Sequence, residues 1–125
     1  MALELCIWDM SLDAARDLSD YQFHIMQLSA EYTADKAAGG DEVLIGVLQN
    51  KPDEEGKAAE IREVGISKVV CGETISIGDL ITADANSHAV VAAGGERYVG
   101  IALEAGVEGR VISHKVEFGY ANETS

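Results

Sequence analysis

The segment Arg110–Tyr120, which reads RVISHKVEFGY, decides the fold, because apolar or aromatic side chains recur at every second position along most of it. Successive side chains of an extended strand point to opposite faces, so this alternation predicts a strand with one apolar face. That face would carry Ile112, His114, Val116, Phe118 and Tyr120.

Shorter segments of similar character follow one another along the rest of the chain. They are Tyr21–Leu28, Val43–Leu48, Ala58–Val64, Ser67–Cys71, Leu80–Thr82, His88–Ala92 and Tyr98–Leu103. Glycine-rich or polar turns separate them, in a chain with 13 glycines and a single proline. Short strands joined by tight turns are typical of an antiparallel barrel or sandwich. The sequence therefore predicts an all-β fold, built as a small β-barrel.

Four short motifs occur twice in the same order, which indicates an internally duplicated unit. The pairs are Thr33-Ala34-Asp35 with Thr82-Ala83-Asp84, Ala37-Ala38-Gly39-Gly40-Asp41 with Ala92-Ala93-Gly94-Gly95-Glu96, Ile45-Gly46-Val47 with Val99-Gly100-Ile101, and Gly56-Lys57 with Gly109-Arg110. A chance likeness between alanine- and glycine-rich turns is the alternative. Duplication predicts a barrel domain over 21–120 with repeats at about 21–65 and 78–120, an N-terminal arm over 1–20 and a tail over 121–125.

The N-terminal arm carries an apolar set that is large for so short a segment: Leu3, Leu5, Ile7, Trp8 and Met10. Because the arm precedes the repeated region, we expect the barrel to close without it. An extended segment of this kind can add to an exposed strand edge of a neighbour, with Trp8 as the main contact. Packing on its own barrel is the alternative. Ser11 also fits the first position of a short helix that would include Leu18.

Composition and charge exclude several classes of partner. The chain has 125 residues, 47% of them hydrophobic and 25% charged, which suits one soluble globular domain. Its net charge of −13 disfavours binding to nucleic acid or to an anionic membrane surface. No apolar run reaches the roughly 18–20 residues of a membrane span, and the start does not resemble a secretory signal. We therefore expect synthesis in the cytoplasm.

The residue types that carry catalysis are not grouped by any motif. His24, His88 and His114 are far apart in the sequence, without the spacing of a zinc site. Cys6 and Cys71 make no disulfide framework; free thiols are favoured, although one bridge between them stays open. We expect no catalytic residue, no metal and no cofactor, and hence not an enzyme.

Several motifs resemble those of capsid decoration (cement) proteins of tailed phages. They are Tyr21-Gln22-Phe23, Ile45–Pro52, Gly65–Val70, Ile77-Gly78-Asp79-Leu80, Val99–Ala105 and Gly109–Ile112. The resemblance implies a small β-tulip-like barrel that forms a homotrimer on the outer surface of an icosahedral head. There it would bind the major capsid protein and stabilise the head by clamping adjacent subunits. The apolar opening Leu3–Met10 and the tail past Phe118 lie outside the shared pattern.

Two other interpretations stay open beside this one. The first is a small β-barrel binding module of a cellular assembly, without catalytic activity. The second is an enzyme or carrier whose site the sequence hides. A protein with a net charge of −13 would repel packaged DNA, so an outer position on a virion suits the charge better than an inner one.

Overall fold

The computed structural model describes the backbone of residues 5–121 and the side chains of residues 8–121. Within this range the chain forms strands and no helix. The strands are β1 (Leu5–Ala14), β2 (Ile25–Ala30), β3 (Thr33–Lys36), β4 (Leu44–Leu48), β5 (Ala58–Val70), β6 (Leu80–Ala83), β7 (Ala89–Val91), β8 (Arg97–Ala102) and β9 (Val111–Tyr120). They form one sheet in the order β1-β3-β2-β4-β5-β9-β8-β6-β7. The prediction of an all-β fold is confirmed.

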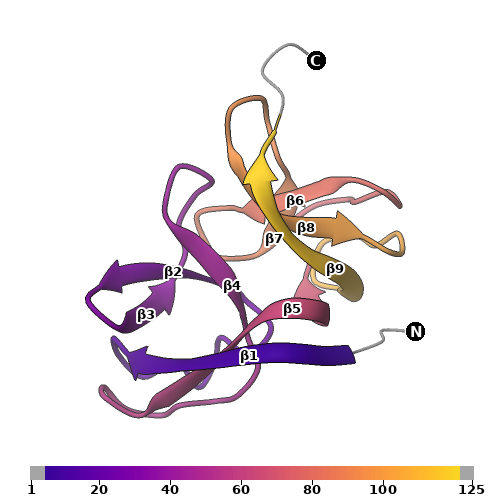
Figure 1. Ribbon diagram of the computed structural model, residues 1–125. Coiled ribbons are helices and arrows are strands. Elements are labelled where there is room, and N and C mark those ends of the chain that lie inside the picture. The colour runs from indigo at the N-terminus through magenta and orange to yellow at the C-terminus, as the bar shows by residue number, and fades with distance from the viewer. Residues whose placement is uncertain (1–4, 122–125) are drawn as a thin grey trace.

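The first five strands close into a barrel, which holds the indigo and purple strands of Figure 1. β1 pairs antiparallel with β5 and, at its end, parallel with β3, so the row β1-β3-β2-β4-β5 returns to its first strand. Closure of this kind leaves fewer unpaired strand edges than an open sheet. The interior is filled by buried apolar residues of all five strands and of the loop after β1: Ala14, Leu18, Met26, Ala34, Leu48, Ala59 and Ile61.

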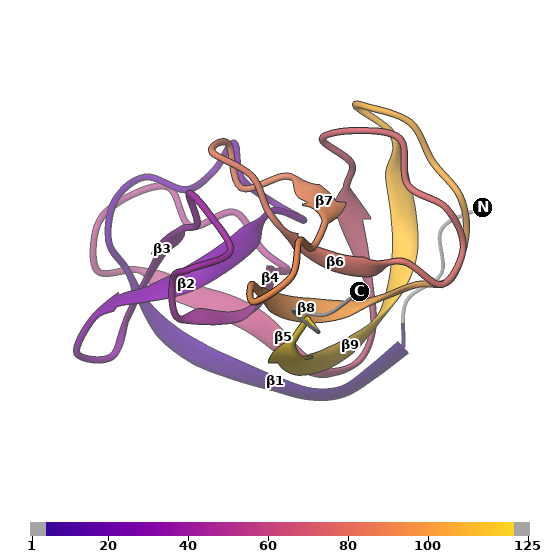
Figure 2. The ribbon, with the colours of Figure 1, turned by 90° about the horizontal axis from the view of Figure 1, so that it is seen from above.

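The later strands form a second barrel, which shares β5 with the first. The far end of β5 pairs with β9, which is followed in the sheet by β8, β6 and β7. A parallel bridge from Cys71 to Ala89 then joins β7 to the end of β5. Figures 1 and 2 show β5 running from one barrel into the other. Residues of the first half, including Ile25 and Val47, complete the core of the second barrel at the junction.

The two barrels have the same pairing register. Equivalent pairs are Leu12–Ala59 and Val69–Ile112, Asp13–Ala58 and Val70–Val111, and Ala14–Ala34 and Cys71–Ala89. β1 therefore has the same place in the first barrel that the far end of β5 has in the second. The equivalent segments begin within β1 and within β5, so the repeat bounds predicted at about 21–65 and 78–120 leave out the first strand of each.

Three of the four repeated motifs occupy equivalent places in the two barrels. The Ala-Ala-Gly-Gly motif directly follows β3 in the first barrel and β7 in the second. The motif around Gly46 and Gly100 lies within β4 and β8, and the Gly-Lys or Gly-Arg pair precedes β5 and β9. The fourth match is wrong, because Thr33 belongs to β3 whereas Thr82 belongs to β6. Since β6 pairs as β2 does, the true counterpart of Thr82 is Gln27, opposite Asp35.

A glycine in the middle of β4 and one in the middle of β8 let neighbouring strands approach closely. A Cβ atom on Gly46 would collide with the carbonyl oxygen of Arg62, and one on Gly100 with the carbonyl oxygen of Lys115. Both collisions involve backbone atoms of the next strand, which cannot turn away as a side chain could. The same requirement explains why a glycine occurs in both copies of this motif.

The segment 1–20 differs from its prediction in two respects. The short helix beginning at Ser11 is wrong, because Ser11 lies within β1 opposite Glu60 of β5. The segment is also paired with its own barrel over Leu5–Ala14 rather than detached from it. The local preference of serine for a helix start is weaker than the stabilisation from ten residues of strand pairing.

Two further differences concern strand bounds. The strand expected over Tyr21–Leu28 begins only at Ile25, because Phe23 has φ of 67° and cannot extend it. The two strands expected on either side of Gly65 form one continuous strand, β5. The short strand β3 was not expected at all.

Candidate protein-binding surface

The outer side of β1 and β5 exposes apolar side chains next to each other. Trp8 lies opposite Val64 in the pairing of these strands. The Trp8 side chain is 60% exposed and that of Val64 is 43% exposed. An exposed tryptophan on a paired strand is well suited to binding a protein, because its large ring contributes much contact area when it becomes buried.

The predicted partner-binding residues have different places in the structure. Leu3 lies outside the described residues, and of Leu5 and Ile7 the structure describes only the backbone, in β1. Met10 is partly buried and packs against the core of the first barrel. Among these five residues, Trp8 is thus the one whose side chain is described as exposed.

A buried ion pair holds β1 on the barrel. Arg62 of β5 donates from Nε to a carboxylate oxygen of Asp9 at 3.0 Å, and from Nη1 to the backbone oxygen of Ile66 at 3.1 Å. The Arg62 side chain is only 9% exposed. A guanidinium buried to this extent depends on its carboxylate partner, since an unpaired charge there is costly. The geometry fixes Trp8, the neighbour of Asp9, at the surface of the barrel.

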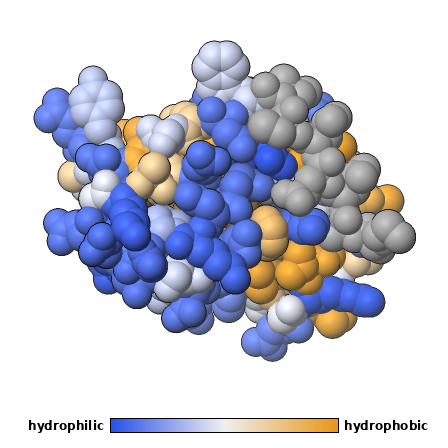
Figure 3. Space-filling view, turned by 90° about the horizontal axis from the view of Figure 1, so that it is seen from below, coloured by the Kyte–Doolittle hydropathy of each residue, from blue (hydrophilic) through white to orange (hydrophobic). Residues whose placement is uncertain are grey.

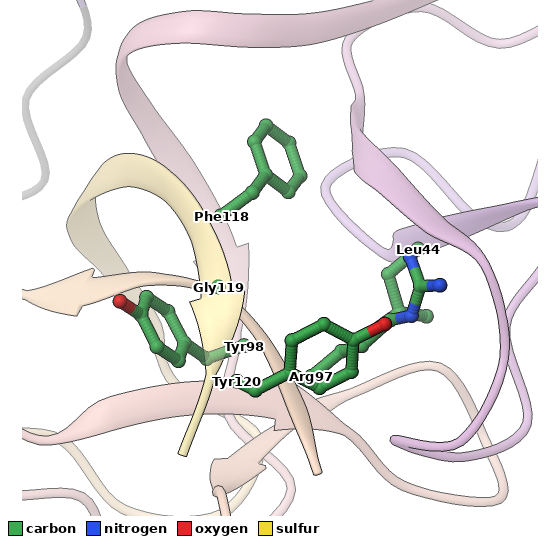
Figure 4. Close-up of a pocket in the computed structure, with 6 residues that line it drawn as sticks. All are labelled: Leu44, Arg97, Tyr98, Phe118, Gly119 and Tyr120. Carbon is green, nitrogen blue, oxygen red and sulfur yellow. The ribbon is translucent and has the colours of Figure 1, made fainter. Parts of the chain in front are cut away.

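A hollow of about 240 Å³ lies between the two barrels, where β4 approaches the end of β9. Its lining residues come from both barrels: Leu44, Arg97, Tyr98, Phe118, Gly119 and Tyr120. Figure 4 shows the aromatic side chains placed around the end of β9, with the Arg97 guanidinium next to the Tyr120 ring. Tyr98 lies directly over Gly119, where a Cβ atom would meet its ring.

A second hollow of about 210 Å³ continues the first along the junction. It is lined by Met10, Leu44, Ile45, Glu63 and Phe118. Leu44 and Phe118 line both hollows, so together these form one groove, which we call the seam groove. Leu44 and Phe118 form its apolar middle, with Arg97 in the first hollow and Glu63 in the second. A groove of this composition can bind an extended peptide by its side chains.

The charges of the seam groove have no ionic partner among the described residues. The guanidinium of Arg97 lies 5.2 Å from the centre of the Tyr120 ring, a cation–π contact. Elsewhere on the chain, arginines such as Arg16 are paired with carboxylates. The chain has 22 acidic residues against 9 lysines and arginines. Arg97 is thus free to bind an anionic group of a partner.

The seam groove is not predicted from the sequence, although the strand that lines it carries a signal for it. The sequence predicts one apolar face along the whole of Arg110–Tyr120, without distinguishing its two ends. In the structure Ile112 and Val116 are buried, whereas Phe118 and Tyr120 extend past the barrel and are exposed. An apolar face longer than a barrel needs, ending in aromatic residues, is the feature that could have indicated a binding surface.

Two histidines that are distant in the sequence meet at the contact between the barrels. The rings of His24 and His88 have centres 4.6 Å apart. His24 Nδ1 lies 2.7 Å from the Ser87 hydroxyl, and His88 Nδ1 lies 4.0 Å from a carboxylate oxygen of Asp84. Burial, and next the nearby His88, lower the pKa of His24. A backbone hydrogen bond from the Ile25 N–H to the Ser87 oxygen joins the same segments.

The chemistry available to this histidine cluster is limited. In the part of the chain that the structure describes, no three histidine, cysteine or acidic side chains converge as metal ligands would. The hydroxyl of Ser87 also donates to its neighbouring backbone oxygen on Asn86, and the residue is fully buried. The cluster therefore serves best as a contact between the two barrels.

Two other reactive residues lie inside the second barrel. His114 is fully buried, and neither of its ring nitrogens has a hydrogen-bond partner among the described residues. Burial lowers its pKa to about 4, and the nearby backbone of Ser67 opposes that shift only in part. Cys71 is buried with a free thiol, whose pKa is raised mainly by burial. Both side chains are buried inside the second barrel.

The described residues include no helix long and apolar enough to cross a membrane. No protein-family model matches the chain, and no curated protein matches it. Its fold is similar to the crystal structure of the N base of the head fiber protein gp8.5 of bacteriophage phi29, with a TM-score of 0.66 at 16% sequence identity. The likeness covers 88% of this chain and 93% of that one. The chain thus has the fold of a phage head fiber base along nearly its whole length.

Proposed function

We propose that this protein is a capsid decoration protein, which binds the outer surface of a phage head and stabilises it by clamping adjacent major capsid protein subunits. The observation that carries the proposal is the likeness of the whole fold to a phage head fiber base. A shared fold can serve unrelated functions, so the surface must support the proposal as well. The role needs binding and no catalysis.

Two exposed apolar features support a binding role. Trp8 and Val64 form one on the outer side of β1 and β5, and the seam groove is the other. The face of the protein seen in Figure 3 is mostly hydrophilic and carries a limited hydrophobic area. Restricted apolar areas on a polar surface are typical of proteins that bind partners without aggregating.

The charge of the protein supports an outer position on the head. With a net charge of −13, the protein would be repelled by densely packed DNA inside a capsid. On the outer face the same charge keeps particles dispersed. Many copies on one shell would convert a modest contact per copy into firm attachment. We expect a homotrimer, because a threefold site on a head is matched by threefold symmetry.

Co-sedimentation tests the proposal. Purified protein is mixed with expanded phage heads assembled from a major capsid protein, and bound protein is measured by quantitative gel analysis. We expect saturable binding and a higher melting temperature of the heads. Light scattering of the free protein should give the mass of a trimer. Protein that never sediments with heads would contradict a decoration role and favour a binding module of another assembly.

The role of Trp8 is tested on the same heads. Replacement by alanine should weaken binding at least tenfold, because truncating a central tryptophan of an interface typically costs about 2 kcal/mol or more. Tyr32 is also an exposed aromatic residue, in the turn between β2 and β3 beside Asp13 at the other end of β1, and Tyr32→Ala is the matched control. Equal binding of both variants would remove β1 from the proposed interface.

A further inference from the structure

We propose that the seam groove binds an extended segment of the capsid protein that carries a carboxylate side chain next to apolar ones, an inference that rests on the proposed function. The carboxylate would lie at Arg97, and the apolar side chains between Leu44 and Phe118. The groove would thereby be a second contact with the head, separate from Trp8.

The charge of the groove argues for this ligand. Of the two arginines without a carboxylate partner among the described residues, Arg97 and Arg110, Arg97 is the one that lines the groove. Its guanidinium is held over the Tyr120 ring, 5.2 Å from the ring centre, and its donors are free to receive a planar anion. A carboxylate can accept two parallel hydrogen bonds from a guanidinium, which gives both strength and orientation.

The shape of the groove argues for an extended peptide rather than a small anion. The two hollows share Leu44 and Phe118 and follow one another across the junction. Leu44 is buried and forms an apolar floor, whereas Phe118 and Tyr120 stand exposed beside it. A small anion would use Arg97 alone and leave this apolar length uncovered. An extended segment would cover it, and a basic side chain at its far end would meet Glu63.

The groove also spans both barrels, which has a mechanical consequence. Leu44, Ile45, Met10 and Glu63 belong to strands of the first barrel, whereas Arg97 and Tyr98 belong to β8 of the second. A peptide seated in the groove would contact both and oppose their separation. Binding to the folded form alone stabilises a protein, so the ligand should raise the melting temperature.

A charge-reversal pair tests this inference. Arg97→Glu places a second acidic group in the groove and should weaken binding to expanded heads at least tenfold. Arg110→Glu makes the same change of charge at an exposed residue outside the groove and should leave binding within twofold. Arg97→Lys keeps the charge but loses the paired hydrogen bonds, and an intermediate loss is expected. Thermal unfolding of the free variants verifies that each is folded.

The outcomes separate this inference from the proposed function. If the wild-type protein does not bind heads, the proposed function fails and this inference fails with it. If the wild-type protein binds and Arg97→Glu binds as Arg110→Glu does, the groove inference alone is overturned. If Arg97→Glu does not fold, Tyr120→Ala replaces it, since the Tyr120 side chain is 65% exposed and contributes little to the core.

Photo-crosslinking identifies the chemistry of the bound segment. A benzoylphenylalanine residue in place of Tyr120 is activated on assembled heads, and the captured capsid peptide is sequenced by mass spectrometry. We expect a non-helical peptide with an aspartate or glutamate and apolar neighbours. Capture of a peptide without an acidic residue, or no more capture than from the same label at Tyr32, would overturn the inference.

Discussion

The first barrel places Ile61 and the second places His114 at the same point of the pairing pattern. Ile61 lies opposite Leu48, and His114 lies opposite Ala102. Each also covers the glycine of its barrel, Gly46 or Gly100. One barrel is therefore filled by an aliphatic side chain where the other accepts a titratable ring, because the smaller Ala102 leaves room for it.

The barrels also differ in the strand that closes them. The first is closed by β1, which precedes the rest of its barrel, and the ion pair of Asp9 with Arg62 holds it there. The second is closed by the far end of β5, which continues from the first barrel without a break. The equivalents of Asp9 and Arg62 are Ile66 and Lys115, which cannot form an ion pair. Continuity of the chain makes such a link unnecessary in the second barrel.

Deletion of residues 2–10 should have the largest effect of the changes considered. It removes most of β1 and takes the carboxylate of Asp9 away from the buried Arg62. Loss of such a partner alone costs about 3 kcal/mol or more, so we expect the melting temperature to fall by about 10 °C at least, or no cooperative transition. Circular dichroism and calorimetry measure it, with Trp8→Ala as the control that keeps β1. A deletion variant as stable as the wild type would restore β1 to the role of a detachable arm.

Alanine at the two equivalent glycines should destabilise both barrels alike. A Cβ atom at Gly46 or Gly100 meets a backbone carbonyl, so each variant should lose about 3 kcal/mol in urea denaturation. Gly56 and Gly109, with φ of 87° and 85°, have open space around them. Alanine there should cost only about 1 kcal/mol, from the backbone conformation. A large loss of stability for Gly46→Ala but not for Gly100→Ala would mean that the two barrels share their strand order but not their close strand packing.

His114 should make the second barrel sensitive to acid. Its pKa of about 4 in the folded protein lies below the ordinary value of 6.5, so the folded state disfavours the proton. The stabilisation is complete above pH 6.5 and is lost as the pH falls toward 4, by an amount on the order of 3 kcal/mol. His114→Ile should flatten this part of the stability profile, measured by denaturation from pH 7.5 to 4. A variant with the wild-type pH dependence would contradict this origin.

Much of the fold could be predicted because the apolar period of two and the glycine turns are local signals. The strand predicted over Arg110–Tyr120 matches β9 nearly to its ends. The strands predicted around the repeated motif of Gly46 and Gly100 correspond to β4 and β8. The same signals predict a strand through Phe23, where the structure has a turn. Phe23 has φ of 67° where its counterpart Gly78 has φ of 87°, and nothing in the side chain indicates the left-handed backbone. The pairing that follows the turn fixes this conformation.

The candidate surface was less accessible to sequence reasoning. Trp8 was identified by composition, since it is the only tryptophan and lies in an apolar segment. The seam groove depends on how the barrels meet, which brings Leu44 of β4 close to Phe118 of β9. No local pattern links two residues that are so far apart in the chain. The meeting of His24 with His88 depends on the same junction.

The contact between these two histidines carries the smallest predicted effect. His88→Asn should raise the pKa of His24 toward its ordinary value, because it removes the neighbouring charge that opposes protonation. Burial of the His24 ring still lowers the pKa, while Asp84 and the backbone of Asn86 favour the proton, so the rise is partial. Titration by nuclear magnetic resonance measures it, with His114→Ile as the control that leaves His24 unchanged. An unchanged pKa in His88→Asn would mean that the barrels do not hold the two rings together in solution.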